Sequence, residues 1–104
     1  MRQAIISVDH HEAGVLTEVQ PGRKYRFVYN PGYQGNSVSL TLPVRPEPYE
    51  FDTFPPFFDG LLPEGYQLEG LLKFGKIDRN DLFSQLMAVG EDMVGNVTAK
   101  EVLL

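Results

Sequence analysis

The chain has 104 residues, a formal net charge of -5 at pH 7 and no cysteine. Its length predicts one domain, and its hydrophobic fraction of 42% is typical of a folded globular protein. The missing cysteines exclude disulfides and thiolate metal sites, and the acidic charge disfavours direct nucleic-acid binding. No stretch approaches the ~20 apolar residues of a membrane span, and no signal peptide is evident. We therefore expect one cytoplasmic domain over residues 1–104, without a membrane segment.

The first part of the chain has the alternating pattern of β-strands. Short apolar runs at 4–8 and 15–19 flank a polar turn, which predicts a hairpin. Residues 24–29 alternate with period two, so a half-buried strand is expected there. The side chains expected on its buried face are Tyr25, Phe27 and Tyr29.

A further strand is expected at 37–42, where polar and apolar residues alternate again. From Pro43 to Pro56 the chain is rich in proline and loses its periodicity. We expect an extended connector there, packed against the body of the domain. The side chains expected to point inward from the strand at 37–42 are Val38, Leu40 and Leu42.

The second half of the chain predicts three short helices followed by a strand. Two prolines suit the start of the first helix, because proline lacks the N–H group that a first turn leaves unpaired. Asp78 or Asn80 can cap the third helix, and Gly90 is its expected end. This order of elements predicts an α+β fold with a mostly antiparallel sheet and about three short helices. The helices are expected at 57–62, at 66–74 and between 80 and 90, and the strand at 94–104.

No residue pattern in the chain indicates catalysis. His10 and His11 are adjacent, and adjacent side chains in a strand or tight turn point apart, so a polar turn is expected rather than a metal site. Residues 90–95 contain two glycines but lack the Lys and Ser/Thr of a phosphate-binding loop. We expect a protein without enzyme activity, metal or cofactor. A small enzyme that uses a pair of carboxylates is the weakest interpretation, and the acids it would use are Asp52, Asp59 and Glu64.

Residues 54–65 concentrate large apolar side chains and prolines around an Asp-Gly turn. Such a cluster is buried either in the domain's own core or in a partner, and its prolines make it stiff. Between Arg45 and Lys73 there is no basic residue but there are six acids. Apolar anchors with an acidic rim suit a partner with a basic groove, although on charge alone a solvated face is the simpler interpretation. The next aromatic residue, Tyr66, is by itself expected to point inward or to be half-buried.

The segment Phe57-Phe58-Asp59-Gly60-Leu61-Leu62-Pro63 resembles the Phe-Phe-Asp-(Asn/Gly)-Leu-Leu-Pro motif in the N-terminal subdomain of HipA-type serine/threonine kinase toxins. Other segments resemble the same subdomain in the same order, over nearly the whole chain. Glu91 stands where the family usually has Arg, and the chain lacks the phosphate loop and catalytic loop of a kinase. The further segments that resemble the family are 14–16, 27–31, 37–43, 81–83 and 90–97.

The resemblance implies a regulator without catalytic activity. Free-standing versions of this subdomain, the HipS-type proteins, bind a shortened HipA-like kinase, HipT, and restrain its toxicity, and a HipB-like DNA-binding protein is encoded with them. We therefore expect an antitoxin that inhibits a HipT/HipA-like kinase in trans and contacts no nucleic acid itself. The alternative is an N-terminal structural fragment of a longer HipA-type kinase. The side chains expected to contact the partner are Phe57, Asp59, Leu62, Glu64 and Tyr66.

Overall fold

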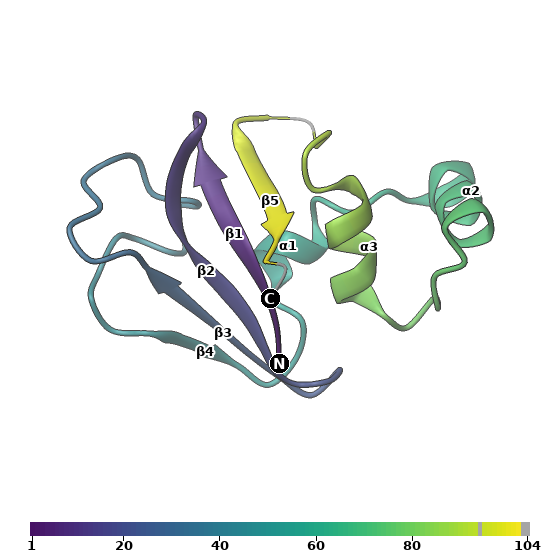
Figure 1. The fold of residues 1–104 in the computed structure, drawn as a ribbon, viewed down its shortest axis with the longest axis horizontal. Helices are drawn as coiled ribbons and strands as arrows, with labels where there is room; N and C mark the ends of the chain where they lie inside the picture. The colour runs from purple at the N-terminus through teal and green to yellow at the C-terminus, as the bar shows by residue number, and fades with distance from the viewer. Residues whose placement is uncertain (94, 103–104) are drawn as a thin grey trace.

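The computed structural model describes residues 1–93 and 95–102 (Figure 1). Within these ranges the chain forms one five-stranded antiparallel sheet, in the order β4-β3-β2-β1-β5, and three helices. The predicted α+β class is therefore confirmed. The strands are β1 (Arg2–Val8), β2 (His11–Gln20), β3 (Lys24–Tyr29), β4 (Tyr49–Phe51) and β5 (Val97–Glu101), and the helices are α1 (Pro56–Asp59), α2 (Gly65–Gly75) and α3 (Leu82–Val89).

The predicted hairpin is formed by β1 and β2, which pair antiparallel. Its turn places Asp9 and His10 in the left-handed region, with φ of 51° and 68°. Two successive residues with positive φ give a turn whose twist matches that of the flanking strands. The last strand, β5, returns beside β1 and forms one edge of the sheet. The parts of the expected final strand at positions 94 and 103–104 lie outside the described residues.

The core lies between the sheet and the two helices α1 and α3. The predicted buried face of β3 is confirmed, since all three of its aromatic side chains are buried. Phe27 is fully buried, with its ring 4.8 Å from the Tyr29 ring and 6.0 Å from the Phe58 ring of α1. Phe83 and Leu86 bring α3 into the same cluster. The alternation of β3 and the apolar face of α3 therefore build one continuous core.

The predicted strand at 37–42 is wrong. Only one bridge, between Ser39 and Leu42, is formed there, and it closes a tight turn. Val38 and Leu42 are buried as predicted, but Leu40 is 99% exposed at the tip of the turn. The Tyr29 hydroxyl explains the difference, because it accepts a hydrogen bond from the Val38 N–H at 2.9 Å and donates to the Leu42 carbonyl. A side chain thus satisfies backbone groups that a neighbouring strand would otherwise pair.

The connector at 43–56 also differs from its prediction, because it contains β4. This short strand pairs with β3 and forms the second edge of the sheet. Arg26 and Glu50 face each other across the pair and form an ion pair at 2.6 Å. The periodicity of the sequence does not reveal this strand, because β4 has only three residues and its flanks are rich in proline. Short edge strands are one way in which a sheet avoids pairing with other chains.

The helices begin and end close to their predicted limits, with two corrections. The first is shorter than expected, ending at Asp59 instead of at Leu62, and continues as a turn. The third is capped by Asp81 and not by Asp78 or Asn80, since the Asp81 carboxylate accepts from the Ser84 N–H at 3.1 Å. Gly90 follows the last residue of α3, as predicted.

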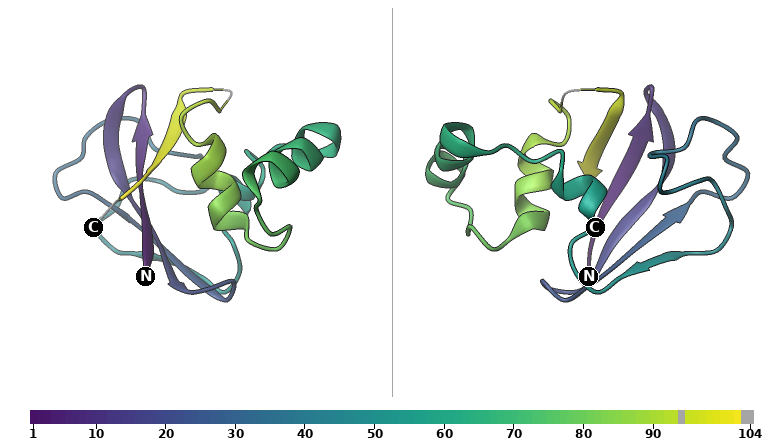
Figure 2. Two further views of the ribbon diagram at one scale, coloured as in Figure 1. Left: turned by 45° about the vertical axis from the view of Figure 1, so that its right-hand side comes forward. Right: turned by 180° about the vertical axis from the view of Figure 1, so that it is seen from behind.

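Helix α2 projects from the body of the domain (Figures 1 and 2). It has the position predicted for 66–74 to within one residue at each end, but none of its residues is buried. Its ends are marked by Gly65 and Lys76, which have φ of 60° and 53°. None of the helices in the described part of the chain is long and apolar enough to cross a membrane.

Candidate functional site

Residues 54–66 contain the apolar cluster singled out from the sequence, and the structure divides it between core and surface. Phe54 and Phe58 are buried. The Phe58 ring packs against Phe27 of β3, while Phe57 is half-buried and packs on the outside of the core. Most of the cluster therefore belongs to the domain's own core, which leaves only part of the segment available to a partner.

The five side chains predicted to contact a partner lie in different environments. Leu62 is 8% exposed and belongs to the core, and Phe57 presents only part of its ring. Asp59 and Glu64 are exposed. Tyr66 is 97% exposed, so the inward or half-buried position expected for it is wrong. Its helix lies away from the sheet (Figure 2), and none of the residues of that helix is buried.

The outer face of α2 presents a second aromatic side chain that was not predicted as part of the site. Phe74 is 86% exposed and follows Tyr66 by eight residues. At 1.5 Å per residue, the two lie ~12 Å apart along the helix axis and on neighbouring parts of one face. Gly70 lies midway, and nothing is within 4 Å of the position that its Cβ would take. The four- and eight-residue spacing from Tyr66 is the sequence signal for this face.

A groove of about 620 Å³ lies between the α1–α2 connector and the C-terminal end of α3. Two exposed carboxylates, those of Glu64 and Asp92, line it. Glu64 was predicted as a contact residue, whereas Asp92 was not. Among the described residues, neither carboxylate takes part in an ion pair. The apolar lining comes from both sides and consists mainly of Leu61, Leu62, Pro63, Val89 and Met93.

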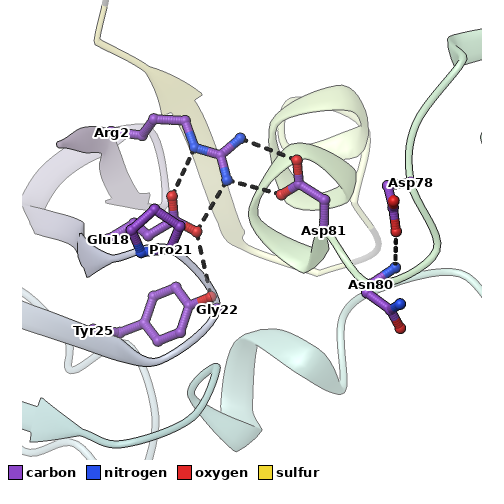
Figure 3. A pocket seen from close by; sticks show the side chains of 8 residues that line it. All are labelled: Arg2, Glu18, Pro21, Gly22, Tyr25, Asp78, Asn80 and Asp81. Carbon is purple, nitrogen blue, oxygen red and sulfur yellow. Dashed lines mark hydrogen bonds and ion pairs between the residues drawn. The ribbon is translucent and has the colours of Figure 1, made fainter.

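A polar network joins β1 and β2 to the first turn of α3 (Figure 3). Arg2 donates to both carboxylate oxygens of Glu18 at 2.8 and 2.9 Å, and to Asp81 at 2.8 Å. Glu18 is only 4% exposed and also accepts from the Tyr25 hydroxyl at 3.3 Å. Asp81 in turn accepts from the Ser84 hydroxyl at 2.7 Å. Arg2 thus connects a buried carboxylate with the cap of α3.

The network shifts the pKa values of Arg2, Asp81 and Tyr25. Hydrogen bonds to Glu18 and then to Asp81 raise the pKa of Arg2. Burial by itself would raise the pKa of Asp81, but hydrogen bonds from Arg2 and Ser84 outweigh it, and the pKa is lowered. Burial, followed by the charge of Glu18, raises the pKa of Tyr25. The pKa shifts of Arg2, Asp81 and Tyr25 all lead away from neutral pH, which indicates a structural clamp.

The clamp was not predicted, although one sequence signal for it exists. Glu18 is in phase with Leu16 on β2, so an alternating strand places this carboxylate on the buried side. A buried carboxylate needs a cationic partner. The cationic partner, Arg2, is 16 residues away from Glu18, and Asp81, which Arg2 also contacts, is 63 residues away, so neither gives a local pattern.

The remaining candidates for chemistry are not brought together by the fold. His10 and His11 are exposed at the β1–β2 turn, and the described residues contain no cluster of metal-binding side chains. Residues 90–93 form the turn that follows α3, where a Cβ on Gly90 would lie 2.2 Å from the Ala99 carbonyl oxygen. Asp52 is exposed beyond β4 and does not line the groove that contains Glu64. The arrangement is suited to binding a partner through α2, the connector and the groove.

Residues 4–100 match the family model described as the HipA N-terminal domain. A solved structure described as the N-terminal domain of HipA toxin aligns with a TM-score of 0.76 at 32% identity, over 99% of this chain and 94% of that one. A protein of Haemophilus influenzae (strain ATCC 51907 / DSM 11121 / KW20 / Rd), described as uncharacterized, is 39% identical over 88 residues, which are 85% of this chain and 81% of that protein. On this sequence match and shared fold, the chain belongs to the HipA N-terminal domain family.

Proposed function

We propose that this domain is an antitoxin without catalytic activity that binds a HipA-family serine/threonine kinase and inhibits it in trans, as HipS-type proteins act on HipT. Membership of the HipA N-terminal domain family supports the kinase as the partner. The relative in H. influenzae supports action in trans. Its 88 matched residues make up 81% of its length, so in that organism the domain occurs in a protein about as short as this chain.

The exposure of Tyr66 is the observation that carries the proposal. An aromatic ring that is 97% exposed contributes nothing to the core of its own domain. Tyrosine is enriched among the residues that dominate binding energy at protein interfaces. The ring lies at the start of α2, directly after the connector that contains Pro63 and the exposed Glu64. It is thereby presented at a projecting part of the molecule (Figure 1).

Inhibition follows from the way in which kinases work. Phosphoryl transfer requires the enzyme to close around ATP and its metal ions. A rigid projection wedged against the lobes prevents that closure. Proline at position 63 limits the motion of the connector, so little conformational entropy is lost on binding. The acidic side chains beside Tyr66, above all Glu64, favour a partner surface that is basic.

The rest of the assembly follows from the same proposal. The complex acts in the cytoplasm, and a HipB-like DNA-binding protein joins it through the kinase. This domain makes no direct contact with nucleic acid, because its net charge of -5 repels the phosphate backbone.

A second candidate function is structural, as the N-terminal domain of a longer HipA-type kinase. The solved domain of the HipA toxin, which this chain matches over 94% of that chain's length, favours it. The reading frame of the gene distinguishes the two functions. A frame that continues into a kinase core supports the structural role, whereas a stop codon followed by a separate kinase gene supports the antitoxin.

The proposed contact of Tyr66 and Glu64 with the kinase is tested by replacing each of them separately with alanine. Inhibition of a purified HipA-family kinase from the same genome is then measured. We expect Tyr66→Ala to raise the concentration needed for half-inhibition by about tenfold or more, as for an interface hot spot. Its free energy of unfolding should stay within about 0.5 kcal/mol of the wild type, as for other exposed positions. Leu40→Ala is the matched control, because Leu40 is 99% exposed in the turn at 39–42, which is not part of α2. If all these variants inhibited the kinase equally well, the proposal that Tyr66 and Glu64 contact the kinase would be refuted.

A further inference from the structure

The groove between the α1–α2 connector and α3 leaves apolar side chains uncovered. Leu61, Val89 and Met93 are half-buried, and all three pack against the core cluster. They are therefore held in place from below while their outer surfaces face the groove. Helix α2 contributes one residue, the exposed Gln67, to the lining. A hollow of about 620 Å³, lined by apolar and polar side chains together, has the size of a binding site.

The charges around this hollow are of one sign. Glu64 at the start of α2 and Asp92 after the end of α3 are both exposed, and no Lys, Arg or His is among the lining residues. Glu91, beside Asp92 in the sequence, is exposed as well. Carboxylates without cationic partners in the described chain attract a cationic group from elsewhere.

We propose that this groove is a docking pocket for an apolar side chain flanked by Lys or Arg on the surface of the HipA-family kinase. The apolar side chain packs on Leu61, Val89 and Met93 and removes them from water. The flanking cation lies between Glu64 and Asp92, with its aliphatic stem along the apolar wall. This inference rests on the proposed function and adds a contact that is separate from Tyr66.

The two contacts differ in what they do to the kinase. The groove contributes affinity and selects the partner by its charge. Tyr66 also contributes affinity, and in addition its ring prevents the kinase from closing. A variant with a damaged groove therefore needs a higher concentration to inhibit but still inhibits completely at saturation. A variant without the Tyr66 ring leaves residual kinase activity even when the kinase is saturated.

The test measures the dissociation constant and the inhibition at saturation for a purified HipA-family kinase from the same genome. Asp92→Lys reverses a charge in the groove, and Glu47→Lys makes the same net-charge change in the exposed loop before β4, at the opposite sheet edge from β5. Ala88→Phe fills the groove without a change of charge, because Ala88 is exposed on α3 and lines it. Circular dichroism and thermal unfolding establish that each variant is folded.

We expect Asp92→Lys and Ala88→Phe to raise the dissociation constant about tenfold or more and to leave inhibition at saturation complete. Glu47→Lys should change the dissociation constant by less than about twofold at 0.15 M salt, because distant exposed charges are screened. If Asp92→Lys and Glu47→Lys changed the dissociation constant equally and Ala88→Phe left it unchanged, the docking pocket would be overturned. Inhibition of the kinase by the wild type would still support the proposed function in that case. No binding by the wild type would overturn the proposed function itself.

Discussion

Removing the Arg2 side chain should destabilise the domain far more than removing another arginine from the same sheet. In Arg2→Ala, Glu18, which is 4% exposed in the wild type, loses its only ion-pair partner among the described residues. An unpaired buried charge costs about 3–5 kcal/mol. The Arg2 side chain is 36% exposed, so water reaches part of the site, and Tyr25 still donates to Glu18. We therefore expect a loss of about 3 kcal/mol, the lower end of that range.

Arg26→Ala is the matched control for this prediction. Arg26 lies on β3 and pairs with Glu50 on β4, and both side chains are 45% exposed. Exposed pairs of this kind contribute about 0–1 kcal/mol. Both variants remove one arginine from the sheet, but Arg2→Ala removes two ion pairs and Arg26→Ala removes one. The difference between them therefore measures the burial of Glu18 and the connection to Asp81.

The assay is urea-induced unfolding at pH 7, followed by circular dichroism, with the free energy of unfolding obtained by linear extrapolation. A third variant, Glu18→Gln, removes the buried charge and keeps the shape of the side chain. It should cost less than Arg2→Ala, because no charge is then left unpaired. A loss for Arg2→Ala no greater than that for Arg26→Ala would refute the account of the clamp.

Two further predictions concern α2 and the cap of α3. Gly70→Ala should raise the free energy of unfolding by about 0.5–1 kcal/mol in urea, because glycine is unfavourable inside a helix and nothing lies where the new Cβ would go; a loss of stability would contradict this. Because the pKa of Asp81 is lowered in the folded state, its charge stabilises the fold at pH values above 3.8, the ordinary pKa of an aspartate. This stabilisation is lost as the pH falls through the folded-state pKa of Asp81. Asp81→Asn, which can still cap the helix, should therefore be less stable than the wild type at pH 7, with the difference shrinking below about pH 4; a constant difference would contradict the assignment.

The alternation of β3 was sufficient to predict its buried face, because period two and a half-buried sheet imply each other. The same pattern failed at 37–42. There the Tyr29 hydroxyl takes the hydrogen bonds of Val38 and Leu42, and the chain turns at Leu40 instead of running as a strand. The hydrogen bond between Tyr29 and Val38 joins residues nine positions apart. A pattern of alternating residues within 37–42 contains no information about it.

The candidate site was predictable in outline but not in its division between core and surface. The Phe-Phe-Asp motif indicates burial, and the fold buries Phe58 and Leu62 but leaves Tyr66 outside. Tyr66 is outside because α2, which begins at Gly65, projects from the body of the domain (Figure 1). The groove combines the connector with Asp92 and its neighbours, about 30 residues further along, so it exists only in the folded chain.

The central claim is tested most directly by mixing the purified domain with a purified HipA-family kinase from the same genome. Size-exclusion chromatography reports the complex, and transfer of labelled phosphate reports kinase activity. We predict a stable complex in which phosphorylation is suppressed by the wild type and restored in part with Tyr66→Ala. A complex with undiminished phosphorylation, or no complex at all, would contradict the antitoxin account.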